Sequence, residues 1–132
     1  IIYIIYIMNK LFIWKSILLP GIILLIIDMV YLNSISKIFH KQIFAVQHSP
    51  MTINLYGAIL AYFFLIAGIS YFIIIPKKSL LEAMILGLVI YGVYEGTNYS
   101  ILKNWKMSTV IIDTLWGSVL FGLTTYLTYM LQ

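Results

Sequence analysis

The sequence predicts an all-α fold: an integral membrane four-helix bundle with a short interfacial amphipathic helix between the first and second membrane-spanning helices. Two observations support it. Of the 132 residues, 63% are hydrophobic and 9% are charged, whereas a soluble domain is about 45–50% apolar and about 25% charged. The lysines also separate hydrophobic stretches long enough to cross a bilayer at about 1.5 Å per residue. A soluble domain of this length could not bury so much apolar surface, so we expect one membrane domain over residues 1–132.

Four spans are expected, at about residues 11–33, 55–75, 79–102 and 108–131. Pro20 predicts a kink inside the first span, because its ring nitrogen cannot donate to the Ser16 carbonyl. Pro76, followed by two lysines, predicts a tight turn that makes the second and third spans an antiparallel hairpin. Residues 1–7 are apolar but too short to cross a bilayer, and whether they belong to the native product is left open.

The longest connection, residues 34–54, contains a helical pattern at about 34–47. Apolar side chains recur there at helical spacing, and Lys37, His40 and Lys41 occupy the opposite face. Such segregation predicts an amphipathic helix that lies in the membrane interface with its lysines toward lipid phosphates. Pro50 and the two residues before it are expected to end this helix.

The basic residues indicate neither a nucleic-acid partner nor an orientation. The formal net charge is +4, but the lysines are scattered and form no continuous basic face. We call the end of the bundle with both expected termini side A, and the opposite end side B. Lys10, Lys15, Lys77 and Lys78 fall on side A, and Lys37, Lys41, Lys103 and Lys106 fall on side B. The positive-inside rule therefore gives no orientation, and the identity of the membrane is left open.

All four acidic residues fall inside expected spans, where a carboxylate costs about 2.5–3.5 kcal/mol near the helix centre. Asp28, Glu95 and Asp113 lie on three different spans at a shared depth, about 7–9 Å from the helix midpoints toward side B. Glu82 instead begins the third span, where it complements the helix dipole. Polar or aromatic residues share a helix face with each of the three acids, among them Tyr31, Asn98 and Trp116.

Small residues recur at four-residue spacing, and such rows let helix backbones approach closely in lipid. The expected packing positions are Gly57, Ala61, Gly92, Gly96, Ser100, Ser118 and Gly122. The aromatic residues Trp14, Trp105 and Tyr129 lie near expected span ends and are interpreted as interfacial anchors. We therefore expect a compact bundle with a polar plug near side B.

Three ordered motifs resemble a known family of membrane proteins. They lie at Ile27–Leu32, at Tyr91–Asn98 followed by Leu102–Trp105, and at Ile112–Gly117. They are similar to Leu-Asp-x-x-Trp-Leu-Gly, to Tyr-Gly-x-Tyr-Asp-x-Thr-Asn followed by Leu-Lys-x-Trp-Pro, and to Val-Asp-x-x-Trp-Gly. With Ala67-Gly68 and Pro76, they resemble domain of unknown function family 2177, small four-helix membrane proteins, from about residue 14 to the C-terminus.

The resemblance implies signature positions but no activity. The matching residues are Asp28, Glu95, Thr97, Asn98, Asp113, Trp116 and Gly117. Tyr31, Asn33 and Glu95 stand where the family pattern has Trp, Gly and Asp. The longer Glu95 moves its carboxyl by about one methylene, which matters where chemistry needs positioning within about 0.5 Å.

Three classes of function are compatible with these residues. The favoured hypothesis is a structural or accessory subunit of a larger membrane assembly, and the alternatives are a proton- or cation-coupled transporter and a lipid-modifying membrane enzyme. The expected polar cluster comprises Asp28, Tyr31, Glu95, Thr97, Asn98, Asp113 and Trp116. No catalytic residue, metal site or cofactor is assigned. The expected partners are the lipid bilayer and either further copies of the chain or other membrane proteins.

Overall fold

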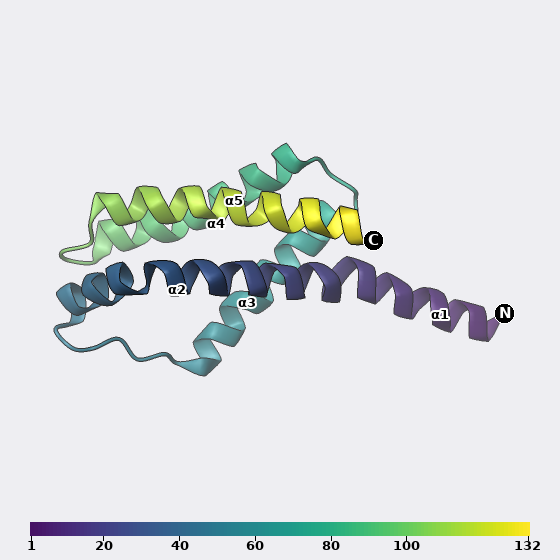
Figure 1. Ribbon diagram of the computed structural model, residues 1–132, viewed down its shortest axis with the longest axis horizontal. Helices are drawn as coiled ribbons and strands as arrows, with labels where there is room; N and C mark the ends of the chain where they lie inside the picture. The colour runs from purple at the N-terminus through teal and green to yellow at the C-terminus, as the bar shows by residue number, and fades with distance from the viewer.

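The computed structural model describes residues 1–132 and contains helices without strands (Figure 1). The α1, η1 and α2 segments follow one another without a break, as do α3 and η2, so four continuous helices are long and apolar enough to cross a membrane. This confirms the predicted helical membrane protein. The bounds are α1 Ile2–Ile13, η1 Trp14–Leu18, α2 Leu19–Gln47, α3 Leu55–Ile69, η2 Ser70–Ile74, α4 Leu80–Ile101 and α5 Met107–Leu131.

The first continuous helix is much longer than the expected first span. It runs for 46 residues, or about 69 Å, against a hydrocarbon core of about 30 Å. The expected separate interfacial helix at 34–47 is not formed, because these residues continue α2 to Gln47. No Gly or Pro interrupts this stretch, and the Ser34 hydroxyl donates to the Val30 carbonyl of the same helix at 2.8 Å. The helix ends at His48, which adopts the left-handed conformation with φ 56°.

Pro20 is accommodated by a widened turn. Residues 14–18 form one π-helical turn, in which the Leu19 N–H donates to the Trp14 carbonyl five residues back. Because Pro20 has no N–H, the Lys15 carbonyl is left without a helical donor, and the side-chain amide of Gln132 donates to it at 2.8 Å. Figure 1 shows α1 running at an angle to α2. The predicted irregularity is present, and the carbonyl that takes its donor from outside the helix is that of Lys15.

The tightest packing joins α4 and α5, which run side by side in Figure 1. A Cβ atom added to Gly87 would collide with the main chain of Gly117, and one added to Gly117 would lie 2.6 Å from the Gly87 carbonyl oxygen. The two backbones therefore touch, as small residues permit in lipid. Toward side A, this contact adjoins the apolar core. The core is formed by Leu24, Ile69, Ile73, Ile74, Ala83, Leu120 and Phe121.

The expected small-residue positions divide into two groups. Gly122 lies under Met84, whose Cγ would be 2.8 Å from an added Cβ, and Gly92 faces Thr114 at 3.5 Å. Ser118 is half-buried. The close approach expected at Gly57, Ala61, Gly96 and Ser100 is not made with another helix. Gly96 has open space, a Cβ added to Gly57 would meet only Asn54 at the start of its own helix, at 4.0 Å, and Ala61 and Ser100 are exposed.

The register of α4 explains this division. The side of α4 that meets α5 carries Ala83, Gly87, Tyr91 and Glu95, all buried or half-buried at four-residue spacing. The expected row begins at Gly92, one residue later, and is therefore rotated by about 100° around the helix. One step in sequence thus turns most of that row away from the contact.

The turn before α4 is fixed by local chemistry. Lys77 adopts a left-handed conformation with φ 57°. The Ser79 hydroxyl accepts from the Glu82 N–H, and the Glu82 carboxylate accepts from the Ser79 N–H, which forms a complete capping box. Lys78 pairs with Glu82 at 3.2 Å. Glu82 therefore lies at the helix N-terminus, as predicted, and takes no part in contacts with the other three acids.

Candidate functional site

Asp28 joins three helices through its carboxylate. It lies on α2 and is 5% exposed. The indole N–H of Trp116, on α5, donates to its Oδ1 at 2.8 Å. The hydroxyl of Tyr62, on α3, donates to its Oδ2 at 2.5 Å. Both oxygens of this buried carboxylate therefore have a donor, as a buried charge requires.

A second contact joins α2 and α5, with the roles of donor and acceptor exchanged between the two helices. The Tyr31 hydroxyl on α2 donates to Oδ1 of Asp113 on α5 at 3.1 Å. The Tyr31 ring stacks on Trp116 with centroids 4.1 Å apart and planes 7° from parallel. Each helix thus supplies one acid and one aromatic donor, three residues apart. We call Asp28, Tyr31, Asp113 and Trp116 the reciprocal clamp.

Glu95 extends the polar region to α4. Its side chain is fully buried, and the indole N–H of Trp105, in the connection between α4 and α5, donates to Oε2 at 2.7 Å. The carboxyl of Asp113 is its neighbour across the α4–α5 contact. The other oxygen, Oε1, is buried and receives no hydrogen bond from a donor.

The loop that carries Trp105 is tied to the far end of α2 by Gln42. This side chain is 3% exposed. It donates to the Asn104 carbonyl at 2.8 Å and accepts from the Lys106 N–H at 3.1 Å and from the Thr109 hydroxyl at 3.0 Å. The Asn104 amide in turn donates to the Ala45 carbonyl at 3.2 Å. These contacts explain why residues 34–47 continue α2 and do not form a separate interfacial helix: one face of this part of α2 packs against the loop between α4 and α5.

The structure brings together five of the expected polar residues and leaves two apart. Thr97 is exposed, because a residue two positions after Glu95 points to the opposite side of α4. Asn98 is half-buried, and its side chain lies outside the hydrogen-bonded contacts around Glu95.

Two donors were missed by the sequence reasoning. Tyr62 lies in the middle of the second span with no motif around it, and nothing in the sequence singled it out. Trp105 was interpreted as an interfacial anchor, and that interpretation was wrong: it is 6% exposed and hydrogen-bonded to Glu95. Its place in the Leu102–Trp105 motif, ten residues after Glu95, was the signal that could have identified it.

The chemistry of the site is that of carboxylates held by phenol and indole donors. No three side chains of His, Cys, Asp or Glu converge on one point that could hold a metal ion. His40 and His48 lie beyond the polar region, on the last turns of α2 and just after it. The aromatic donors fix the orientation of each carboxylate within the helix contacts.

Comparison with known proteins adds the family. The model of the family described as "Predicted membrane protein (DUF2177)" matches residues 13–130, which include every contact described above except that of Gln132 with Lys15. No curated protein and no solved structure matches the chain significantly. The chain is thus a multi-pass helical membrane protein that belongs to the family of predicted membrane proteins known as domain of unknown function 2177.

Proposed function

We propose that this protein is a structural or accessory subunit of a larger membrane assembly, and that its carboxylate cluster, Asp28, Glu95 and Asp113, holds the bundle in a single register. The observation that carries this proposal is the reciprocal clamp. Its two hydrogen bonds cross between α2 and α5 in opposite senses. A shift of either helix by one residue would separate both acids from their donors at once.

The energetics favour a role in specificity. Interhelical polar contacts in membrane proteins average only about 0.6 kcal/mol. Leaving a buried acceptor without its donor costs about 1–3 kcal/mol, and more for a charged group. The carboxylates therefore add little to the total stability of the correct register but penalise each incorrect one strongly. This is what a subunit needs if it must present one defined surface to its neighbours.

The surface we propose for that neighbour is the outer face of α4. Gly96 has no heavy atom within 4 Å of an added Cβ, and Ser100 is exposed, with its hydroxyl bonded to the Thr97 carbonyl of its own helix. With Gly92 these residues form a row at four-residue spacing. Rows of small residues allow close helix approach in lipid. A second copy of this chain or a helix of another membrane protein would fit there.

Copurification from the native membrane tests the subunit role. The tagged full chain is isolated in mild detergent, and the stoichiometry of the complex is measured by light scattering and mass spectrometry. We expect a fixed ratio to one partner, or a defined homo-oligomer, that is lost when Gly96→Leu fills the open face. Gly57→Leu, at an exposed glycine of α3, is the matched control. A monomer with no constant partner would contradict the proposal.

One observation favours a second candidate, a proton- or cation-coupled transporter. Glu95 Oε1 is buried without a donor beside the Asp113 carboxyl. Two carboxyls can hydrogen-bond to each other only through a proton carried by one of them. Proteoliposomes with an imposed pH gradient decide between the two functions. A structural subunit leaves the gradient intact, whereas a transporter dissipates it and loses this activity on Glu95→Gln.

A further inference from the structure

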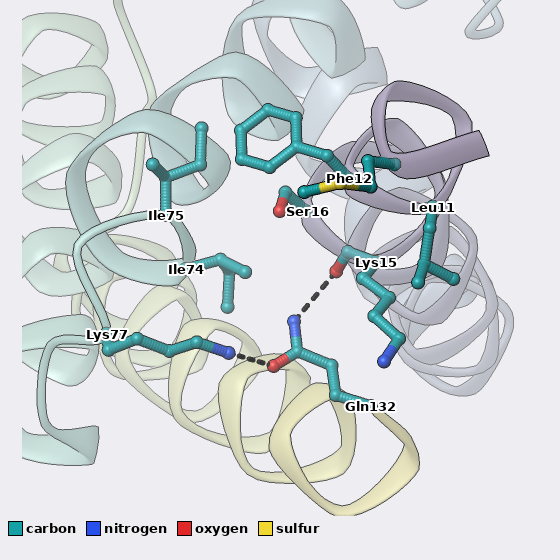
Figure 2. Close-up of a pocket in the computed structure, with 9 residues that line it drawn as sticks. Leu11, Phe12, Lys15, Ser16, Ile74, Ile75, Lys77 and Gln132 are labelled. Atoms are coloured by element: carbon teal, nitrogen blue, oxygen red, sulfur yellow. Dashed lines mark hydrogen bonds between the residues drawn. The ribbon is translucent and has the colours of Figure 1, made fainter. Parts of the chain in front are cut away.

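A cavity of about 500 Å³ opens at side A, between η1 and the end of η2. Figure 2 shows Lys15 and Ser16 on one side, Lys77 on the other, and Gln132 across the base. Gln132 bridges the two sides: its amide nitrogen donates to the Lys15 carbonyl at 2.8 Å, and its amide oxygen accepts from the Lys77 ammonium. The cavity is therefore built by the same contact that compensates for Pro20.

The polar lining of this cavity includes two lysines that make no ion pair with an acidic side chain. Lys15 and Lys77 both line it, and the single ion pair of the chain joins Lys78 to Glu82 and involves neither of them. Ser16 is 8% exposed, and Figure 2 shows its hydroxyl directed into the cavity on the side away from Gln132. Two ammonium groups and a hydroxyl are the donors that bind a phosphate.

The remaining lining is apolar. Leu11 and Phe12 on one wall, and Ile74 and Ile75 on the other, flank the charged groups. A free inorganic anion finds no complement in these side chains, whereas a molecule with a charged head and a hydrocarbon tail does. Cavities of about 300–1,000 Å³ are of the size that holds such ligands.

The cavity lies at the height along the bundle that lipid headgroups would occupy. Lys15 lies 22 residues before Lys37 in one continuous helix, a distance of about 33 Å, which matches a hydrocarbon core of about 30 Å. A lysine side chain on a helix leans toward the N-terminus, so the Lys15 ammonium is directed outward at side A. The cavity thus places its charges where phosphates lie.

We propose that this cavity is a binding site for an anionic glycerophospholipid, with its phosphate at the mouth of the cavity, contacted by the ammonium groups of Lys15 and Lys77, and its chains against Phe12 and Ile75. Bound there, the lipid joins the first helix to the turn between η2 and α4. The site is independent of the carboxylate cluster and of the subunit role.

Native mass spectrometry of the detergent-purified full chain tests the site. Phosphatidylglycerol and phosphatidylcholine with identical oleoyl chains are titrated separately. We expect tighter binding of phosphatidylglycerol. Because one lysine near a lipid surface contributes about 1 kcal/mol, or about fivefold, Lys15→Gln/Lys77→Gln should weaken this binding by about 30-fold. Lys37→Gln/Lys41→Gln removes the same charge from side B and should leave the binding unchanged.

Three outcomes would overturn the proposal. Equal affinity for the two lipids would remove the role of headgroup charge. Equal weakening by the two double variants would reduce the effect to net charge. Displacement of the lipid by inorganic phosphate would assign the cavity to a free anion. Ile75→Trp, which narrows the apolar wall without altering charge, should also weaken phosphatidylglycerol binding, and unchanged thermal unfolding of each variant shows that the fold is intact.

Discussion

The indole of Trp105 donates a hydrogen bond to Oε2 of Glu95 at 2.7 Å, and both side chains are buried. The tryptophan belongs to the short connection after α4, and the acid lies inside the helix that the connection follows. The loop therefore folds back over the end of its own helix and closes the polar region on side B. Gln42 holds it in that position from α2.

Trp105→Phe should destabilise the bundle, because it keeps most of the ring but removes the donor and leaves the buried Glu95 with none. We expect a loss of about 1–3 kcal/mol in the free energy of unfolding, measured by titration with sodium dodecyl sulfate in mixed micelles. Trp14→Phe is the control, since Trp14 is 44% exposed and should have no measurable effect. Equal stability of the two variants would mean that the hydrogen bond to Glu95 adds nothing.

The neutral triple variant Asp28→Asn/Glu95→Gln/Asp113→Asn separates a structural role of the acids from a functional one. If the carboxylates hold the bundle together, the variant unfolds more easily than wild type, because charged acceptors bind the phenol and indole donors more strongly than amides do. Unfolding is followed by tryptophan fluorescence in detergent from pH 5 to 8. A variant more stable than wild type would indicate that the acids are kept at a cost to folding, and would favour the transporter.

Gly87→Ala should disrupt the contact between α4 and α5. The added methyl group would strike the main chain of Gly117, and overpacking of this kind costs about 1–3 kcal/mol or more. Gly96→Ala, on the open face of the same helix, should leave the stability of the isolated chain unchanged. Both are measured by thermal unfolding in detergent. If Gly96→Ala were destabilised more than Gly87→Ala, the assignment of Gly87 to the packed face of α4 would be wrong.

Gln42→Leu should release the loop between α4 and α5, because it removes three hydrogen bonds made by one buried amide. Hydrogen exchange of residues 102–106 should then accelerate, since the opening of this loop breaks fewer contacts with α2. Gln47→Leu, which affects only bonds to the carbonyls of Ser49 and Pro50, is the matched control. Unchanged exchange in Gln42→Leu would show that Trp105 and the bond from Asn104 to Ala45 are enough to hold the loop.

The class of the protein and its four long helices could be predicted from the sequence, because length, hydropathy and the positions of Pro76 and the lysines act locally along the chain. The sequence also predicts a shared depth for Asp28, Glu95 and Asp113, because the rise per residue is constant in a helix. The continuation of α2 through residues 34–47 was not predicted, because an amphipathic pattern looks the same whether its apolar face meets lipid or protein.

The partners of each polar group were decided only by the tertiary structure. Local sequence places the Asp28 side chain at a given height and on a given face of its helix. Whether Trp116 or Tyr62 reaches it depends on how all the helices are rotated about their axes, which the packing of the whole bundle determines. The contact of Gly87 with Gly117, in place of one at Gly96, has the same origin. Hydropathy determines that a helix crosses the membrane, and only close packing between helices determines which side of it faces a neighbour.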